Sequence, residues 1–214
     1  MTMTATERAY AFAKQRILDG RFAGGELISE GDVAAGVNLS RTPVREAFLR
    51  LESEGLLKLF PKRGALVVPV SAAEVEHVME TRLVVERFAV EKIIRAGTEL
   101  HGAPEAAIAA QERLVGGEDA PEFVEADREF HRTFVAGAGN PILLQLHDSL
   151  RDRQSRMGLA ALARDADRIR QILEEHRAIA AAVRARDADG AHRIVGRHLQ
   201  GTLALLRGGA AGVD

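Results

Sequence analysis

The sequence predicts a mostly α-helical protein with two parts, three helices with a small β-ribbon followed by a bundle made only of helices. Three observations lead to this prediction. Apolar residues recur at helical spacing through most of the 214 residues. Two short apolar runs flank Pro61-Lys62-Arg63-Gly64, as strands flank a turn. Glycine and proline then break the rest of the chain into helical segments.

The two domains are expected to meet at residue 70. Ser71-Ala-Ala-Glu74 is a capping box, in which two side chains satisfy free amides at the start of a new helix. We therefore expect a first domain over residues 1–70 and a helical domain over residues 71–207. The glycine-rich end, residues 208–214, is expected to be a flexible tail.

The first domain begins with an amphipathic helix over residues 5–18, whose apolar side includes Ala13 and Ile17. A second, short helix is expected to open at Ser29-Glu30-Gly31-Asp32, with an acidic first turn. Residues 36–39 are the expected turn into a third helix. Helix, turn and helix in this order predict a helix-turn-helix.

The third helix has the clearest start and end signals. Thr42 is a good N-cap, and Pro43 suits the first helical position because no amide hydrogen is needed there. Arg45 and Arg50 lie off the apolar stripe of this helix, toward solvent or DNA. Arg41 stands just before the cap and can project from the helix N-terminus, which itself attracts phosphate.

A basic ribbon follows the third helix at once. Residues 56–60 and 65–70 are predicted to be strands, with Lys62 and Arg63 in the turn between them. A short helix for the major groove beside a basic wing is how a winged helix-turn-helix binds double-stranded DNA. The alternative is a small three-helix domain with ordinary surface arginines. The joint occurrence of cap, turn and basic residues favours DNA binding.

Composition narrows the class of protein. The chain has 29 Lys and Arg against 31 Asp and Glu, a net charge of −2, so positive charge is a local feature of the third helix and ribbon. The absence of cysteine excludes disulfides and thiolate metal sites. The sequence contains neither a signal peptide nor an apolar run of membrane-spanning length, so we expect a cytoplasmic protein without membrane contact.

The second domain has helical periodicity throughout, with breaks at glycine and proline. The expected helices are 72–96, 103–115, 120–136, 141–157, 166–185 and 188–206. This domain is therefore predicted to be an all-α helical bundle.

Potential metal ligands interrupt three of these apolar stripes. Asp127 and His131 lie four residues apart and so share a helix face. His176 and His198 interrupt the stripes of the last two helices. If the turn is centred near Asp187, both histidines lie about 16 Å from it, at about 1.5 Å per residue, and should face each other.

Three imidazoles and one carboxylate, without sulfur, suit a divalent cation, zinc before nickel or manganese. Each residue also has a plainer interpretation. A core histidine is more often hydrogen-bonded and structural, and Asp127 with His131 could be a surface pair. The coincidence of all four residues on apolar stripes favours a metal site. His101, His147 and His192 show no such pattern and are expected on the surface.

Arg82 also lies on an apolar stripe, and a guanidinium facing a core needs an anion. Its structural partner would be Glu86, one turn away. Its functional partner would be the carboxylate of a ligand bound beside the metal. Both interpretations remain open, and Arg153 is a weaker second candidate for ligand binding.

Residues 8–70 resemble the DNA-binding domain of the GntR transcription regulators. The residues that carry the resemblance are Ser40–Ala47, Leu51-Glu52, Glu54-Gly55 and Pro61–Gly64. Pattern and resemblance together predict DNA contacts from Arg41, Thr42, Arg45, Arg50, Lys62, Arg63 and Gly64. One departure is Gly31, where some members carry an arginine for DNA. That contact is expected to be missing here.

Residues 72–206 resemble the FCD ligand-binding domain of the FadR-type subgroup of the same family. The residues that carry this resemblance are Arg82–Glu86, Asp127–His131, Gly139–Pro141, His176 and His198. In metal-binding members an aspartate and three histidines at this spacing hold a divalent ion, which implies Asp127, His131, His176 and His198 as ligands here. Members that bind acyl-CoA lack this set, so the resemblance argues against a fatty acyl-CoA effector.

The sequence therefore predicts a metal-containing transcription regulator, with repression relieved by ligand as the commoner arrangement in such families. One recognition helix reads only a few base pairs, so we expect a homodimer on a palindromic operator. The expected effector is a small carboxylate that binds the metal and Arg82. One alternative is a metal-dependent enzyme fused to a DNA-binding domain. Another is an architectural DNA-binding protein with a structural metal, which would leave Arg82 unexplained.

Overall fold

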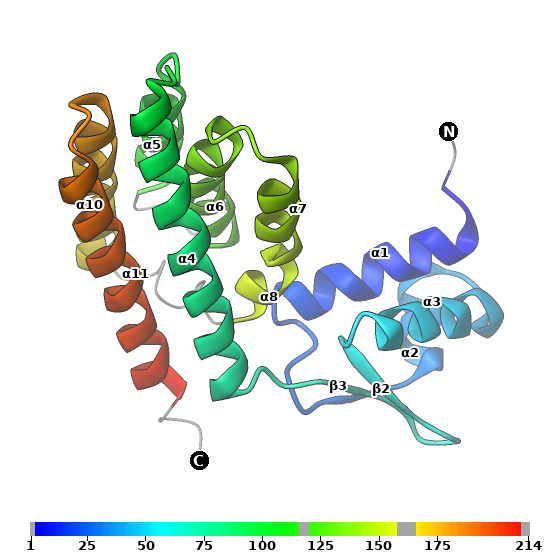
Figure 1. The fold of residues 1–214 in the computed structure, drawn as a ribbon. Coiled ribbons are helices and arrows are strands. Elements are labelled where there is room, and N and C mark those ends of the chain that lie inside the picture. The colour runs from blue at the N-terminus through cyan, green and yellow to red at the C-terminus, as the bar shows by residue number, and fades with distance from the viewer. Residues whose placement is uncertain (1–2, 116–119, 158–165, 211–214) are drawn as a thin grey trace. The chain divides into compact units, whose positions relative to one another are not determined.

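The computed structural model describes residues 3–115, 120–157 and 166–210, and it is mostly helical, as the sequence predicts (Figure 1). The chain divides into two units, residues 1–70 and residues 71–214. The first unit combines helices with a small sheet, and the described part of the second contains helices only.

The first unit has the winged helix-turn-helix arrangement. Its elements are α1 (Ala5–Leu18), β1 (Leu27–Ile28), α2 (Glu30–Val37), α3 (Arg41–Ser53), β2 (Leu57–Phe60) and β3 (Gly64–Val67). The sheet is antiparallel in the order β1-β3-β2, with Leu27 opposite Leu66 and Leu57 opposite Val67. The sequence does not predict β1, because two residues are too few to show an alternating pattern.

One apolar core holds the first unit together. Its fully buried residues include Ala13 on α1, Val33 on α2 and Phe48 on α3, and Val67 closes it from the sheet. Burial of each larger side chain in this core contributes about 1.5–3 kcal/mol to the free energy of unfolding. The core therefore fixes α3 against the other helices and leaves its opposite, basic face exposed.

The start of α3 differs from the prediction. Its N-cap is Ser40, with an extended backbone at φ −75° and ψ 166°, and the helix begins at Arg41. Thr42 therefore lies inside the helix and is not the cap. Pro43 is tolerated at the third helical position because none of the first four helical amides has a partner within the helix. The helix could thus begin two residues earlier than a proline at the first position would require.

Gly64 has a structural reason to be glycine at the start of β3. Its φ of +102° is strained for any residue with a side chain. A Cβ added there would lie 2.4 Å from the carbonyl oxygen of Ile28. The close approach of β1 to the wing therefore depends on this glycine.

The second unit is a bundle that begins at the predicted residue, but among the described contacts only the Ser71 half of the expected capping box is found. The Ser71 hydroxyl accepts a hydrogen bond from the Glu74 amide at 3.1 Å. The helices are α4 (Ala72–Ala96), α5 (Ala103–Glu112), α6 (Ala120–Gly137), α7 (Pro141–Ser149), α8 (Arg151–Arg156), α10 (Ala166–Arg184) and α11 (Ala188–Ala210). The segment expected as one helix over 141–157 is two helices that meet at Leu150.

The long helix α4 lies against α11 and α6, and α5 packs against α6 and α10 (Figure 1). The expected stripe of α4 is buried, including Val78, Arg82 and Ala89. Helix α11 continues to Ala210, so the first residues of the expected tail are helical, and residues 211–214 lie outside the described part. No helix within the described ranges is long and apolar enough to cross a membrane.

Candidate DNA-binding surface and metal centre

A groove of about 850 Å³ on the first unit collects the predicted basic side chains. Arg41 and Arg45 line it from α3, and Lys62 and Arg63 line it from the turn of the wing, together with Gly64. All four basic residues are exposed. A concave, basic surface between a recognition helix and a wing matches what phosphate and base edges require of a DNA-binding module.

Two of the predicted DNA-binding residues do not line this groove. Thr42 is exposed on α3 but outside it. The Arg50 guanidinium lies 3.7 Å from the centre of the Tyr10 ring, and its Nε is 3.3 Å from a carboxylate oxygen of Glu54. Lys14 pairs with the same carboxylate at 3.0 Å. Arg50 is thus held in a cluster of its own domain.

The departure at Gly31 leaves room for another arginine. A Cβ added at Gly31 would lie 3.6 Å from Nη2 of Arg41. The guanidinium of Arg41 therefore passes over the position where a side chain would otherwise stand. Some members of the family have an arginine at the position of Gly31. In this protein Arg41 of α3 places its guanidinium beside that position instead.

Glu52 lies in the candidate DNA-binding groove, although the sequence patterns do not single it out. It lines the groove from α3, and its Oε1 accepts a hydrogen bond from the Leu59 amide of β2 at 2.8 Å. This bond ties the first strand of the wing to the recognition helix. Its position next to Leu51, whose side chain is buried, was the available signal.

In the second unit, the four predicted metal ligands come together. One ligand atom from each of Asp127, His131, His176 and His198 lies within 4.8 Å of the others. The three histidines are buried, and Asp127 keeps 17% of its side-chain surface exposed. The set is drawn from α6, α10 and α11, so residues up to 71 positions apart converge on one point.

The Nε2 atoms of the three rings point into this cluster. Nε2 of His198 lies 3.2 Å from Nε2 of His131. Nε2 of His176 lies 3.5 Å from Oδ1 of Asp127, and Nε2 of His131 lies 3.9 Å from Oδ2 of the same carboxylate. Within the described residues, the buried Nε2 of His176 has no hydrogen-bond partner. An unsatisfied buried nitrogen that faces other ligand atoms is what a metal site requires.

The contacts of Nδ1, which points away from the cluster in His131 and His198, further support a bound cation. Nδ1 of His131 lies 2.7 Å from a Glu86 oxygen, and Nδ1 of His198 lies 2.6 Å from a Glu175 oxygen. If each neutral ring donates its one N–H to its carboxylate, two Nε2 lone pairs face each other without a hydrogen between them. Two nitrogens bound to one tetrahedral zinc at about 2.0–2.1 Å would lie about 3.3 Å apart. The observed 3.2 Å fits a shared cation.

The electrostatics of the site keep two of the ligands, His131 and His176, in their metal-binding form. Burial lowers the pKa of His131 despite the opposing charge of Glu86. Burial, followed by repulsion from His198, His131 and Arg82, lowers the pKa of His176 well below its ordinary value. Both imidazoles are therefore neutral at neutral pH, and only neutral imidazole binds a metal ion.

These pKa shifts predict how the metal-free protein responds to acid. In the unfolded chain His131 and His176 take up protons below about pH 6.5, whereas the folded protein keeps them neutral to lower pH. The stability that they contribute is present above pH 6.5 and is lost as the pH falls through their lower folded values. We expect the melting temperature in EDTA to fall between pH 7.5 and pH 5.5. A smaller fall in His176→Ala would support this cause, and an equal fall would contradict it.

Arg82 has the structural partner that the sequence suggests. Its Nε lies 2.7 Å from Oε1 of Glu86, and each side chain is only 2% exposed. Burial alone would raise the pKa of Glu86, but Arg82 and His131 outweigh it and hold that pKa well below its usual range. Glu86 therefore stays charged and connects Arg82 to a metal ligand.

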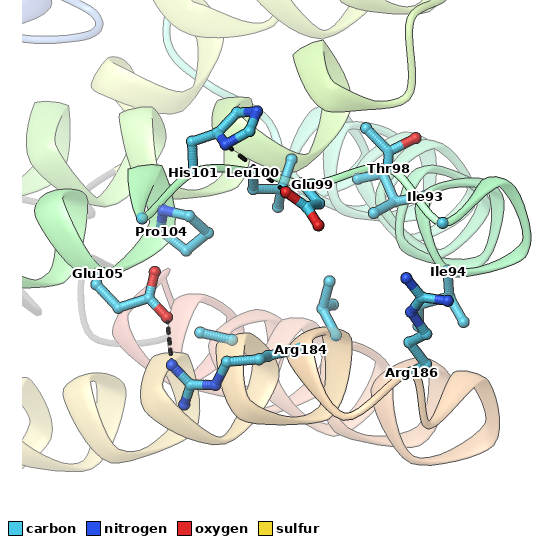
Figure 2. Close-up of a pocket in the computed structure, with 14 residues that line it drawn as sticks. Ile93, Ile94, Thr98, Glu99, Leu100, His101, Pro104, Glu105, Arg184 and Arg186 are labelled. Atoms are coloured by element: carbon cyan, nitrogen blue, oxygen red, sulfur yellow. Dashed lines mark hydrogen bonds and ion pairs between the residues drawn. The ribbon is translucent and has the colours of Figure 1, made fainter.

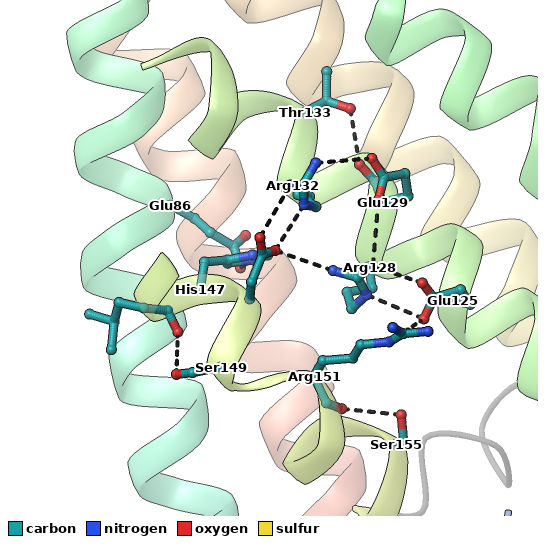
Figure 3. A network of polar contacts seen from close by, with 12 residues as sticks. Glu86, Glu125, Arg128, Glu129, Arg132, Thr133, His147, Ser149, Arg151 and Ser155 are labelled. Carbon is teal, nitrogen blue, oxygen red and sulfur yellow. Dashed lines mark hydrogen bonds and ion pairs between the residues drawn. The ribbon is translucent and has the colours of Figure 1, made fainter. Parts of the chain in front are cut away.

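His147 is a correction to the sequence analysis, which places it on the surface. Its side chain is fully buried, and its Nε2 lies 3.7 Å from Oε1 of Glu86 (Figure 3). The buried residues of this segment are His147, Leu150, Gln154 and Met157. Arg153 is half exposed and lies 3.6 Å from Glu74, so it is not placed to bind a ligand in the core.

Ion pairs fix α7 beside α6, next to His147. Nε of Arg132 donates to Oδ1 of Asp148 at 2.8 Å, and Nη1 of Arg128 lies 3.5 Å from the same oxygen. Within α6 itself, Nη2 of Arg128 donates to Glu125 at 2.7 Å (Figure 3). Arg132 and Arg128 each follow a predicted metal ligand directly in the sequence. One side of α6 therefore carries two ligands, and an adjoining side carries the arginines that hold neighbouring residues.

A separate pocket of about 300 Å³ opens where the α4–α5 connection faces the end of α10 (Figure 2). Arg184 pairs with Glu105 at 2.8 Å on one side of it, and Arg186 stands on the other (Figure 2). Its lining includes the buried side chains of Ile93 and Val183. None of the four clustered ligands lines this pocket, so it is distinct from the candidate metal centre.

Comparisons with known proteins agree with both domains. Residues 5–67 match the bacterial regulatory proteins of the gntR family, and residues 77–201 match the FCD domain. The gluconate operon transcriptional repressor of Bacillus licheniformis is 29% identical over 181 residues, which cover 82% of this chain and 74% of that protein. The galactonate operon transcriptional repressor of Escherichia coli K12 is 26% identical over 212 residues, covering 90% and 93%.

A solved structure has the same fold. The crystal structure of a transcriptional regulator GntR from Rhodococcus sp. RHA1 gives a TM-score of 0.77 at 22% identity and covers 96% of this chain and 99% of that chain. The two operon repressors are transcriptional regulators rather than enzymes, which agrees with the prediction from the sequence. The FCD match alone spans more than half of the chain. The chain therefore belongs to the GntR family of bacterial transcriptional regulators, with a GntR DNA-binding domain followed by an FCD domain.

Proposed function

We propose that this regulator is a homodimeric repressor that binds a palindromic operator. Its affinity for this operator is controlled by a small carboxylate bound at a metal ion in the FCD domain. The observation that carries the proposal is the cluster of Asp127, His131, His176 and His198, whose ligand atoms lie within 4.8 Å of one another. Two copies are needed because one recognition helix reads too few base pairs to specify an operator.

The ligand set supports zinc before nickel or manganese. Three neutral imidazoles and one carboxylate suit a borderline divalent cation, and no cysteine is available to favour a softer one. When bound, such an ion would supply a Lewis acid whose remaining coordination positions accept an anionic oxygen. The four side chains would hold the ion through Nε2 of each histidine and a carboxylate oxygen of Asp127.

Charge supports a carboxylate as the effector. A divalent ion beside Asp127 keeps a formal charge of +1, while Arg82 and Glu86 neutralise each other. The hydrogen bond from Arg82 to Glu86 comes from Nε, and no hydrogen bond from its two terminal nitrogens is found among the described residues. Arg82 could therefore remain bound to Glu86 through Nε and still donate two hydrogen bonds to a ligand carboxylate.

Two relatives add support for this class of ligand. They are named for the gluconate and galactonate operons, and both of these compounds are small hydroxylated carboxylates. A hydroxyl beside a carboxylate offers a second oxygen to a metal ion with open positions. We infer that the effector of this chain belongs to the same broad class, small organic acids.

A thermal-shift screen tests the effector directly. Zinc-loaded protein is heated with a set of small mono- and dicarboxylic acids, and with neutral sugars of the same size as controls. A ligand at 100 times its Kd stabilises the folded protein by about 2.7 kcal/mol, which appears as a higher melting temperature. Stabilisation by acids only supports the proposal. Stabilisation by neutral sugars, or by no acid in the set, would count against a carboxylate effector.

The DNA-binding half predicts the effect of one arginine. Arg45→Ala removes an exposed guanidinium that lines the groove, and loss of a base-reading arginine costs about 1–3 kcal/mol and relaxes sequence preference. A gel-shift titration against DNA selected by the wild-type protein from a random library measures both quantities. Arg21→Ala is the matched control, because Arg21 is also exposed but pairs with Asp19 outside the groove. Equal losses in the two variants would contradict the assignment.

A further inference from the structure

We propose that Glu86, Gln111 and Glu175 are positioning residues of the metal centre, each of which fixes one ligating histidine so that its Nε2 faces the ion. The inference rests on the proposed metal site and extends it from four ligands to a second layer of side chains. It also assigns Glu86 a further role, as the carboxylate that links the metal site to Arg82.

Each ligating ring has one partner for its outward nitrogen, and each partner comes from a different helix. Nδ1 of His131 lies 2.7 Å from Glu86 on α4. Nδ1 of His176 lies 2.9 Å from Oε1 of Gln111 on α5. The third contact has the same form, with Nδ1 of His198 2.6 Å from Glu175 on α10. Three independent contacts of hydrogen-bond length therefore orient three rings in the same sense.

The chemistry of imidazole explains what these contacts do. A neutral ring carries one N–H, and an oxygen acceptor at Nδ1 holds the hydrogen there and leaves the lone pair on Nε2. A carboxylate acceptor also makes the ring a stronger donor to a metal. We therefore expect His131 and His198, which face carboxylates, to bind the ion more strongly than His176, which faces the amide of Gln111.

The two carboxylates are themselves held by buried arginines. Oε1 of Glu86 lies 2.7 Å from Nε of Arg82. Oε1 of Glu175 accepts a hydrogen bond from Gln171 at 3.0 Å and lies 3.7 Å from Nη1 of Arg168, which adds a positive charge. In both cases the other oxygen faces a ligating histidine. Two series of side-chain contacts therefore lead to the metal centre, one from α4 and one from α10. In each, an arginine lies next to a glutamate, and the glutamate contacts a ligating histidine.

The series of contacts through Glu86 couples the affinity for the metal to the affinity for the effector. A ligand carboxylate that accepts hydrogen bonds from the terminal nitrogens of Arg82 shares its positive charge with Glu86, and so changes how strongly Glu86 attracts the Nδ1 hydrogen of His131. Coupling between two bound species is reciprocal, so effector should tighten or weaken metal binding by the factor by which metal changes effector binding.

The test is the zinc affinity of full-length protein, measured by competition with a chromophoric chelator. Glu175→Ala and Gln111→Ala should each weaken zinc binding by about 10–100-fold, the usual effect of removing such a partner. Glu175→Gln, whose amide oxygen can still accept the Nδ1 hydrogen, should lie between Glu175→Ala and wild type. Glu174→Ala is the matched control, because Glu174 is the exposed neighbour on the same helix. It should remain within about two-fold of wild type.

A second measurement separates orientation from folding. In zinc-loaded protein with 15N-labelled histidine, NMR should show three rings bound through Nε2 with their hydrogen on Nδ1, and in Glu175→Ala only the signal pattern of His198 should change strongly. Wild-type zinc affinity in the three variants, or histidines bound through Nδ1, would overturn the positioning role while leaving the metal site intact. Wild-type protein that binds no zinc would overturn both.

Discussion

Replacing His176 with alanine is expected to remove the metal from the protein. His176 is fully buried, its Nε2 has no hydrogen-bond partner among the described residues, and it faces Asp127 at 3.5 Å. A site left with two imidazoles and one carboxylate loses one of four ligands, and metal affinity falls steeply with each. His198→Ala should behave in the same way. Elemental analysis after dialysis should find about one divalent ion per chain in the wild type and little in either variant.

The matched control for these variants is His101→Ala. His101 is 83% exposed and lies outside the cluster, so its loss should leave the metal content unchanged. Circular dichroism in EDTA shows whether each variant still folds. Full occupancy in folded His176→Ala and His198→Ala would contradict the metal site.

Arg82→Ala is expected to weaken effector binding strongly. The side chain is 2% exposed, so a contact between its terminal nitrogens and a ligand carboxylate would be a buried, charge-assisted pair. Truncating one partner of such a pair costs about 2–5 kcal/mol. Calorimetric titration of zinc-loaded wild type and variant, with an acid found in the thermal-shift screen, measures the difference.

Two controls separate the effector contact from structural damage. Arg153→Ala removes a half-exposed arginine paired with Glu74 and should leave the acid affinity unchanged. Operator binding by Arg82→Ala without effector should survive, as should its metal content at saturating zinc. Equal acid affinity in wild type and Arg82→Ala would return Arg82 to a purely structural role with Glu86.

Local patterns explain how much of the fold the sequence could predict. The capping box at Ser71 places the start of α4 correctly, and the helical stripe of α4 predicts its buried face, including Arg82. The predicted N-cap of α3 was wrong because a proline is compatible with several positions in the first turn of a helix. The missed strand β1 has two residues and exists only through its pairing with β3.

The segment around α7 shows how a small error in phase changes a site. The residues Leu143, Leu146, Leu150 and Arg153 have helical spacing and predict one buried face. In the structure His147 is buried in place of Leu146, and Gln154 in place of Arg153. Both sets satisfy the spacing rule, and only packing against α6 and α4 decides between them. The interruption of the helix at Leu150 adds to the ambiguity.

The candidate metal centre was predictable in part for a physical reason. The four ligands each interrupt an apolar stripe, and an i, i+4 pair or a helical hairpin brings such residues together by simple geometry. Their partners Gln111 and Glu175 leave no such trace. Gln111 lies 65 residues from His176, and polar residues on helices are too common for sequence alone to pair them. Contacts between distant helices depend on the packed structure.

The measurement that tests the account most directly is the affinity of zinc-loaded protein for DNA selected from a random library, with and without the acid that raises its melting temperature. Binding is followed by fluorescence anisotropy at fixed salt, because affinity for DNA depends steeply on ionic strength. We expect recognition of a palindromic sequence and a change in affinity of about 5–150-fold when the acid is added. In His176→Ala, which should lack the metal, the acid should have no effect. An operator affinity that the acid leaves unchanged in the zinc-loaded wild type would contradict the proposal.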